Sequence, residues 1–325
     1  MKFIKSEIIG LGGFVPAKTL TNDDLAQMVE TSDKWIVERT GIKSRHIASE
    51  SEHTSDLAFA AASDALKESS TSAEEIDLLI LATITPDNTT PSTACKVANM
   101  LQMRKGAAAF DISAACSGFV YALAVADSMI KNRLAKKALV IGAETISKIT
   151  DWTDRNTCVL FGDGAGAAVL QAVETDDENA SGIIASKIFA GGQDYEYLLT
   201  SGGVSTTQKA GYIMMNGKEV FKNAVVCLAE GAEEVLQKAG MTTDDVDWFI
   251  PHQANIRIIE ATAKRLKVDE NKVIVSLENK GNTSAASIPL AFAENVKSKK
   301  IKKGNIVLLT SMGAGFVWGA VLLKF

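Results

Sequence analysis

The stretch that decides the fold is Ala107-Ala108-Ala109-Phe110-Asp111-Ile112-Ser113-Ala114-Ala115-Cys116-Ser117-Gly118. Its apolar run leads into a cysteine among small residues and then into a long helical pattern. This order predicts a strand, a tight turn and a helix, with a thiol at the turn. Residues 119–126 include no charged side chain. We therefore expect the helix to be buried on all sides, at the centre of the fold.

Cys116 lies where this turn could perform chemistry. The first turn of a helix offers unpaired N–H groups and the positive end of the helix dipole, and both favour thiolate over thiol. Cys116 is therefore a candidate nucleophile. The alternative is that Cys116 is a small apolar residue that packs in the core.

The composition indicates an ordered globular protein. Of 325 residues, 46% are hydrophobic and 22% charged, and only five are proline, which is the balance of a chain that buries a core. The net charge is −5, and without a long basic run this argues against nucleic acid as a partner. The N-terminus has no signal-peptide pattern and no apolar run is long enough to span a bilayer, so we expect a cytoplasmic protein without a membrane partner.

The cysteines do not form a metal or disulfide pattern. Cys95, Cys116, Cys158 and Cys227 are far apart and none belongs to a CxxC pair. Zinc sites and disulfide frameworks normally show close pairing of this kind. We therefore expect no metal site and no structural disulfide.

The chain contains an internal repeat. Residues 65–80 match residues 235–250 at a constant offset of 170, and both segments read as a helix end, a short acidic turn and an apolar strand. The glycine-rich turn and strand at 161–170 are echoed at 312–322. So long a period indicates two homologous half-domains rather than a solenoid. We assign them to residues 1–172 and 173–325, with the polar segment 175–180 as the linker.

Buried strands alternate with helices in both halves, which predicts an α/β protein with a mostly parallel sheet covered on both faces. In the first half we expect strands at 76–82, 107–112 and 138–143 and helices at 55–67, 92–101 and 116–133. In the second half we expect helices at 217–238, 255–266 and 284–297 and strands at 246–251, 272–275 and 306–311.

Two further polar residues follow apolar segments as Cys116 does. His252 comes after the strand Asp247–Pro251, and Asn282 lies in a small-residue turn that opens a helix. Ligands of open α/β sheets bind beyond the carboxyl ends of strands, so these side chains can converge with Cys116. A thiolate, an imidazole and an amide form a known nucleophilic set. Alternatively, Asn282 is a turn or cap residue and His252 a structural histidine.

The turn Gly313-Ala314-Gly315 supplies a fourth part. Small residues let a backbone approach a ligand closely, and its N–H groups can join the Cys116 N–H in holding an oxyanion. The alternative is an ordinary tight turn between two strands.

Five motifs spread over the whole chain carry a resemblance: Thr31–Ile42 (TSDKWIVERTGI), Ala114–Gly118 (AACSG), Phe161–Ala165 (FGDGA), His252–Asn255 (HQAN) and Gly281–Ala285 (GNTSA). Together and in this order they resemble the β-ketoacyl-acyl-carrier-protein synthase III family, of the thiolase fold. The resemblance implies a duplicated αβαβα five-layer sandwich with two mixed sheets, usually a homodimer. It also implies condensation of a short acyl-CoA with malonyl-acyl-carrier protein, without a cofactor, to begin fatty acid synthesis.

The resemblance also implies roles for single residues. Cys116 would be acylated, His252 and Asn282 would hold the thioester oxygen of the malonyl group during decarboxylation, and the N–H groups of Cys116 and Ala314 would form the oxyanion hole. For CoA, Trp35 and Arg155 would sandwich the adenine, Arg39 would meet phosphate, and the rest of the path would follow Thr31, Gly217 and Asn255. Trp35 could instead be a core anchor.

A basic face could dock the acidic carrier protein. Arg257, Lys264 and Arg265 share one face of the helix expected from Asn255, and Lys222 lies on the preceding helix. A solvated helix face explains the same charges.

Two positions depart from common family patterns. Ala314 replaces the middle glycine of a Gly-Gly-Gly turn, which is tolerated if its φ is negative. Thr90 stands where acetyl-preferring members often have Phe, at a position that borders the partner subunit's acyl pocket. We therefore expect a roomier pocket that accepts branched or longer primers.

Related activities fit the chain less well. A thiolase needs a second reactive cysteine near Met312, and elongating condensing enzymes need a second histidine where Asn282 stands. Polyketide-type condensing enzymes share the Cys, His and Asn set and remain an alternative. A rival of another class is a non-catalytic acyl-CoA or acyl-carrier binding protein in which Cys116 is structural.

Overall fold

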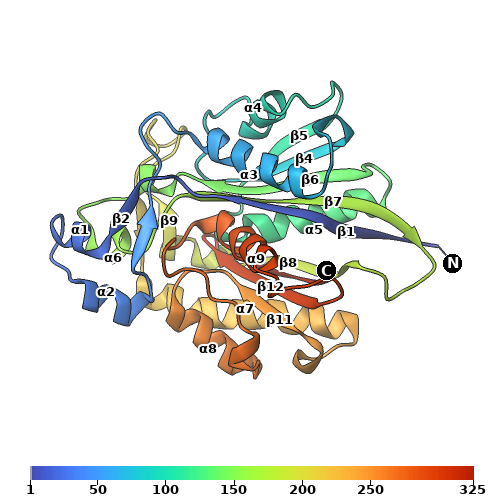
Figure 1. Ribbon diagram of the computed structural model, residues 1–325. Coiled ribbons are helices and arrows are strands. Elements are labelled where there is room, and N and C mark those ends of the chain that lie inside the picture. Colours follow the sequence, from blue (N-terminus) through green and yellow to red (C-terminus); the bar gives the residue numbers. More distant parts are fainter. Residues whose placement is uncertain (1) are drawn as a thin grey trace.

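The computed structural model describes residues 2–325 and consists of five stacked layers (Figure 1). From the top of that view, helices α3 and α4 cover a first sheet, helices α5 and α9 lie between the two sheets, and helices α7 and α8 cover the second sheet. Both sheets combine parallel and antiparallel strands. The fold is therefore the duplicated five-layer sandwich that the family resemblance implies.

The first sheet has the order β1-β7-β6-β4-β5. Its parallel part pairs β4 with both β5 and β6, and β7 runs antiparallel to β6 and β1. The bounds are β1 Phe3–Phe14, β4 Leu78–Ala82, β5 Ala108–Ile112, β6 Lys137–Glu144 and β7 Gly164–Thr175.

The second sheet has the order β11-β12-β13-β8. Only β11 and β12 are parallel, and β13 runs antiparallel to β12 and β8. The bounds are β8 Gly182–Ala190, β11 Trp248–Pro251, β12 Ile306–Gly313 and β13 Val317–Lys324. Residues 176–181 connect the last strand of the first half to the first strand of the second half.

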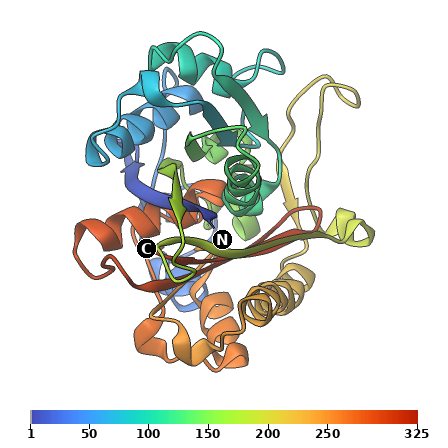
Figure 2. The same ribbon diagram turned by 90° about the vertical axis from the view of Figure 1, so that its right-hand side faces the viewer.

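Each helix layer, seen from another side in Figure 2, buries its own hydrophobic cluster. Ala-rich α3 packs on the outer face of the first sheet, and α7 and α8 pack on the outer face of the second. The central cluster joins α5 and α9 to inward-facing side chains of both sheets. The expectation that residues 119–126 are buried on all sides holds only in part, because Tyr121, Ala124 and Val125 are half-buried. The bounds are α3 Thr54–Glu68, α4 Thr93–Met100, α5 Gly118–Lys131, α7 Gly217–Ala239, α8 Ile256–Leu266 and α9 Ser287–Lys297.

The internal repeat of the sequence appears as a structural repeat. Strands β4 and β11 begin 170 residues apart, and β6 and β12 begin 169 residues apart. Before each central helix lies a short 3-10 turn, Ala115–Ser117 before α5 and Ser284–Ala286 before α9. Ala115 and Ser284 occupy equivalent places in these turns and both have positive φ, 44° and 50°. The two turns pack against each other at the centre of the molecule.

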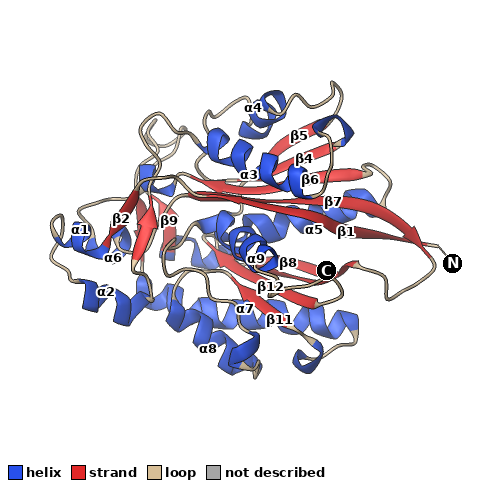
Figure 3. Cartoon of the chain, in the orientation of Figure 1, coloured by secondary structure: helices blue, strands red, loops and turns tan. Residues whose placement is uncertain are grey.

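Smaller elements surround one end of this sandwich (Figure 3). The N-terminal half contributes a two-stranded ribbon and three short helices, and the second half contributes another ribbon. The bounds are β2 Thr19–Thr21, α1 Asn22–Ala26, α2 Asp33–Thr40, β3 Ser44–His46, α6 Arg155–Cys158, β9 Leu198–Thr200 and β10 Ile213–Met215.

Two sequence-based expectations about the sheets are wrong. Residues 272–275 do not form a strand, because the chain enters a 3-10 turn at Glu270–Lys272 and then touches β11 through one isolated bridge, Phe249 to Val273. The sheets are also less parallel than expected. β13 follows β12 through a tight turn, and so short a connection can only join antiparallel strands.

Residues 2–325 lack two features. None of the helices there is long and apolar enough to cross a membrane. Within the same residues, no group of three or more His, Cys, Asp and Glu side chains is arranged to hold a metal ion.

Candidate active site

One cavity of about 750 Å³ brings together residues from both halves of the chain. Cys116 comes from the turn before α5, His252 from the loop after β11, and Asn282 from the loop before α9. Ser284 and Ala314 line the same cavity. The convergence expected of these residues is therefore present in the structure.

The Gly313–Gly315 turn lies directly against Cys116. The Ser311 hydroxyl donates to the Cys116 carbonyl at 2.7 Å. A Cβ atom on Gly313 would lie 2.6 Å from the Cys116 nitrogen, so only glycine fits there. Ala314, next in the chain, is not among the residues with positive φ, which is why alanine is accepted. These contacts hold the backbone of the turn against the turn that carries Cys116.

The expectation that Cys116 favours the thiolate is wrong for the unliganded protein. Burial raises the pKa of the Cys116 thiol to about 12, and the nearby Glu144 carboxyl also raises it, whereas a hydrogen bond with Ser284 lowers it. The α-helix proper begins only at Gly118, after the 3-10 turn that carries Cys116. Loss of hydration therefore exceeds the stabilisation that the helix start offers, and the resting sulfur carries its proton.

His252 is a buried, neutral imidazole. Burial lowers the pKa of His252 to about 3. Its Nδ1 lies 2.6 Å from the Ser287 hydroxyl, which accepts a hydrogen bond from the Gln253 N–H. The Ser287 hydrogen can therefore go to Nδ1, which leaves the imidazole proton on Nε2. In this tautomer His252 is a hydrogen-bond donor through Nε2 and a poor proton acceptor.

Asn282 is held so that its amide can donate. Its Oδ1 accepts from the Ser284 N–H at 2.9 Å, and its backbone is fixed by the Asn282 N–H bond to Leu160 and by the bond from the Gly162 N–H to the Asn282 carbonyl. The oxygen is thus occupied within its own turn, and the NH₂ group keeps its donors. Two neutral donors, from His252 and Asn282, line one cavity.

The Phe161–Ala165 motif holds the backbone behind the site. The Asp163 carboxylate accepts from the N–H of Ala48 at 2.7 Å and from the N–H and hydroxyl of Ser147 at 2.8 and 2.5 Å. A Cβ on Gly162 would lie 2.3 Å from the Lys280 carbonyl, so the motif glycine is needed for close approach to the Asn282 loop. This motif is structural.

The residues expected to bind CoA lie at the other end of the cavity. Trp35, Arg39, Gly217 and Asn255 line it, whereas Thr31 and Arg155 are not among the lining residues. Asn255 caps α8 by accepting from the Arg257 N–H at 2.9 Å.

The expected adenine slot is closed in this structure. The guanidinium of Arg155 lies 5.0 Å from the centre of the Trp35 ring and that of Arg39 lies 4.4 Å from it. Arg155 also donates to the Glu30 carbonyl at 2.8 Å. An adenine sandwiched between Trp35 and Arg155 needs one stacking distance on each of its two faces. Arg155 must therefore move away from Trp35 before an adenine can enter.

The expected carrier-docking residues are all solvent-exposed. Arg257 reaches the cavity mouth and lies 5.7 Å above the Phe221 ring, and Lys264 and Arg265 follow it along α8. Lys222 is exposed on α7. Of these four cations, Arg257 lines the cavity and the other three do not.

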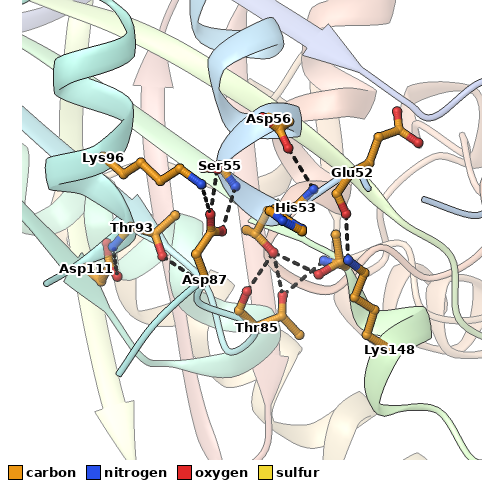
Figure 4. A network of polar contacts seen from close by, with 12 residues as sticks. Glu52, His53, Ser55, Asp56, Thr85, Asp87, Thr93, Lys96, Asp111 and Lys148 are labelled. Atoms are coloured by element: carbon orange, nitrogen blue, oxygen red, sulfur yellow. Dashed lines mark hydrogen bonds and ion pairs between the residues drawn. The ribbon is translucent and has the colours of Figure 1, made fainter. Parts of the chain in front are cut away.

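Thr90 lies on an exposed loop between β4 and α4, outside the cavity of its own chain. Figure 4 shows how this loop is anchored. Asp87 accepts from the Ser55 N–H and hydroxyl at 3.0 and 2.6 Å, and forms an ion pair with Lys96 at 2.6 Å. The loop is therefore firmly held, with Thr90 at its outer edge.

Sequence reasoning missed two residues of the site, Glu144 and Ser284. Glu144 is fully buried at the end of β6 and hydrogen-bonded to the Ser284 hydroxyl at 3.1 Å. The signal was available, because Glu144 follows the apolar segment 138–143 just as His252 follows β11. Ser284 gave no such signal, since its role depends on a contact between the two halves.

Comparison with known proteins agrees with this geometry. The family description "3-Oxoacyl-[acyl-carrier-protein (ACP)] synthase III" matches residues 110–192, and its "C terminal" description matches residues 236–325. A Beta-ketoacyl-[acyl-carrier-protein] synthase III of Rhodospirillum centenum is 55% identical over 322 residues, which are 99% of each chain.

Solved structures give the same result. The 3-oxoacyl-[acyl-carrier-protein] synthase III of Aquifex aeolicus superposes with a TM-score of 0.92 at 50% identity, over 98% of this chain and 100% of that one. The priming β-ketosynthase of the R1128 polyketide pathway superposes with a TM-score of 0.91 at 34% identity, over 98% and 96% of the two chains. The chain therefore belongs to the 3-oxoacyl-[acyl-carrier-protein] synthase III family of acyl-transferring condensing enzymes.

Proposed function

We propose that this chain condenses a short acyl-CoA with malonyl-acyl-carrier protein through an acyl group carried on Cys116. The observation that carries the proposal is the single cavity lined by Cys116, His252, Asn282 and Ala314. Both proposed substrates are water-soluble thioester carriers, so we place the reaction in the cytoplasm. The chemistry as proposed needs no cofactor, because loss of carbon dioxide supplies the carbanion.

In the first half-reaction the Cys116 sulfur attacks the thioester carbonyl of acyl-CoA. The carbonyl oxygen becomes an oxyanion that the N–H groups of Cys116 and Ala314 can stabilise. The contact of Gly313 with the Cys116 nitrogen supports this assignment. The bond from the carbonyl carbon to the CoA sulfur then breaks, and the acyl group remains on Cys116.

In the second half-reaction malonyl-carrier protein occupies the same cavity. His252 Nε2–H and the Asn282 amide donate to its thioester oxygen, where negative charge grows as carbon dioxide leaves. Neutral donors suit this task, since a charged imidazolium is disfavoured by burial. The resulting carbanion attacks the acyl-Cys116 carbonyl, the carbon–sulfur bond breaks, and 3-oxoacyl-carrier protein forms.

The entrance is proposed to bind the carriers of both substrates. Trp35 and Arg155 open to hold the adenine, Arg39 meets phosphate, and Thr31, Gly217 and Asn255 lie along the remaining path. Thr31 and Arg155 do not line the cavity in this structure, so their place on this path follows from the family resemblance. Arg257, Lys222, Lys264 and Arg265 attract the acidic carrier protein.

A homodimer completes the proposed acyl pocket. β5 is an edge strand of the first sheet within this chain, with its residues partly or fully exposed. An uncovered edge can pair with a second copy of itself about a two-fold axis. Thr90 lies on the loop before α4, which packs on β5. In such a dimer Thr90 borders the partner's pocket.

Substitutions should separate the two half-reactions. Cys116→Ser is expected to abolish acyl transfer from acyl-CoA. His252→Ala and Asn282→Ala should retain acylation and lose decarboxylation by about a hundredfold or more, the usual cost of removing one such donor. Acyl-enzyme formation and release of carbon dioxide from malonyl-carrier protein are measured separately. Decarboxylation at the wild-type rate in either alanine variant would disprove the role given to that residue.

The neutral state of His252 has a direct spectroscopic test. Because burial lowers its pKa to about 3, the imidazole should not titrate as the solution passes through the ordinary histidine range. The nitrogen resonances of His252, identified by their absence in His252→Ala, are followed from neutral to mildly acidic pH. A folded histidine with a lowered pKa weakens the fold only as the pH falls below its unfolded pKa. Titration of His252 near its ordinary pKa would contradict this assignment.

The acyl pocket predicts a primer preference. With Thr90 in place of a bulky aromatic residue, the enzyme should accept four- and five-carbon acyl-CoA, including branched primers. Thr90→Phe should reduce these rates and leave that of acetyl-CoA nearly unchanged. Transfer is measured over a panel of acyl-CoA primers with malonyl-carrier protein. Activity with acetyl-CoA alone in the unaltered protein would show that the pocket is not roomier.

A further inference from the structure

Glu144 is a buried carboxyl group that the proposed half-reactions do not use. It ends β6, and its side chain accepts from the Thr85 hydroxyl at 2.6 Å, from the Thr83 hydroxyl at 3.1 Å and from the Ile84 N–H at 3.1 Å. The Ser284 hydroxyl lies 3.1 Å from its second oxygen. A fully buried acid surrounded by four hydrogen-bond donors is an energetically expensive arrangement for a protein interior. Its presence here indicates a specific role for Glu144.

The hydrogen of Thr85 is committed to Glu144. Thr85 Oγ1 accepts from the Thr145 N–H at 3.0 Å, and the Thr54 hydroxyl donates to the Thr85 carbonyl at 2.6 Å. Figure 4 labels Thr85 within the hydrogen-bond network that it shares with neighbouring side chains. The Thr85 O–H is therefore free to donate to the Glu144 carboxyl group. This hydrogen bond favours the ionised form of Glu144 in the resting state.

Ser284 joins this carboxyl to the reacting groups. Ser284 lines the same cavity as Cys116, on a turn that packs against the turn carrying Cys116, and its hydroxyl donates to Glu144 at 3.1 Å. When it donates to the Glu144 carboxylate, its oxygen can accept the S–H of Cys116. Its backbone N–H separately fixes Asn282. This placement gives the thiol proton a path through one hydroxyl to a buried acid.

Acylation needs an acceptor for the thiol proton. His252 is a poor one, since burial lowers its pKa to about 3. Burial raises the pKa of Glu144 to about 7, against the opposing effect of its hydrogen bonds. A group with a pKa near the working pH is best suited to take and return a proton. The other titratable groups around this end of β6 are Asp163, which is bonded to Ser147, and His252 in the Cys116 cavity.

We propose that Ser284 and Glu144 form a relay that accepts the Cys116 proton as the sulfur attacks acyl-CoA. The thiol proton passes to Ser284 Oγ while the Ser284 hydroxyl proton passes to Glu144. The sulfur bonds to the acyl carbon and CoA leaves as a thiolate. Glu144 then returns this proton, through Ser284 or the cavity water, to the CoA thiolate, which leaves the cavity as the thiol. The relay rests on the proposed function, because it serves the acylation of Cys116.

Ser284→Ala and Glu144→Gln test the relay. Ala is tolerated at this positive φ, since Ala115 occupies the equivalent place in the first half, and Gln has nearly the shape of Glu. Both variants keep the backbone bond to Asn282. Single-turnover acylation is followed by mass spectrometry with an acyl-CoA, and decarboxylation of malonyl-carrier protein is measured in parallel. We expect acylation to fall by about tenfold or more and decarboxylation to change little.

The pH profile distinguishes a relay from a structural role. The acylation rate of the wild-type protein should increase as the pH is raised through about 7, where Glu144 loses its proton. This increase with pH should be absent in Glu144→Gln. Ser147→Ala is a matched control, because it removes a serine that bonds another buried carboxyl, Asp163. This variant should retain both the wild-type acylation rate and its increase with pH.

Three outcomes would overturn the relay. Removal of a nearby negative charge alone would lower the thiol pKa, so faster acylation in Glu144→Gln would show that Glu144 acts only by repulsion. If the acylation rate of Glu144→Gln still increased with pH as in the wild type, Glu144 would be excluded as the acceptor of the thiol proton. A parallel loss of acylation, decarboxylation and thermal stability in both variants would show a structural role. Absence of acylation in the wild-type protein would instead refute the proposed function itself.

Discussion

The contact between the two central turns is the constraint on which the rest of the structure depends. A Cβ atom on Gly142 would lie 2.3 Å from the carbonyl of Ala285, and one on Gly118 would lie 2.8 Å from Ala82. These glycines let the turn before α9 press against β6 and let α5 start close to β4. Cys116 and Ser284 are consequently neighbours although 168 residues separate them. Close packing of backbone fixes the site more firmly than any single polar bond could.

Burial sets the protonation states of the titratable groups in the site. It neutralises His252, protonates the resting Cys116 and brings the pKa of Glu144 towards neutrality. A helix start alone would favour a thiolate, but the burial of Cys116 disfavours that charge. His252 and Asn282 are neutral donors, which can stabilise a developing oxyanion or enolate. The basic side chains that line the cavity are Arg39 and Arg257.

Much of the fold could be predicted from the sequence, because its signals were local. The apolar segments of β4, β6 and β12 and the charge-free start of α5 identified a duplicated α/β chain, and glycines near Cys116 and Asn282 located the turns. Residues 272–275 were misjudged because a strand also needs a partner over its length, which local pattern does not reveal. The edge strands β1 (FIKSEIIGLGGF) and β8 (GIIASKIFA) are apolar over much of their length and were nevertheless not predicted. The contacts of Ser284 and the closed Trp35–Arg155 pair arise between distant segments and were invisible for the same reason.

The central claim is that Cys116 carries the acyl group. Its most direct test is mass spectrometry of the intact protein after brief exposure to an acyl-CoA without malonyl-carrier protein, followed by peptide mapping. The account predicts one added acyl group per chain, on the peptide that contains Cys116, and none in Cys116→Ser. An unmodified protein, or an acyl group on the exposed Cys95 instead, would contradict it.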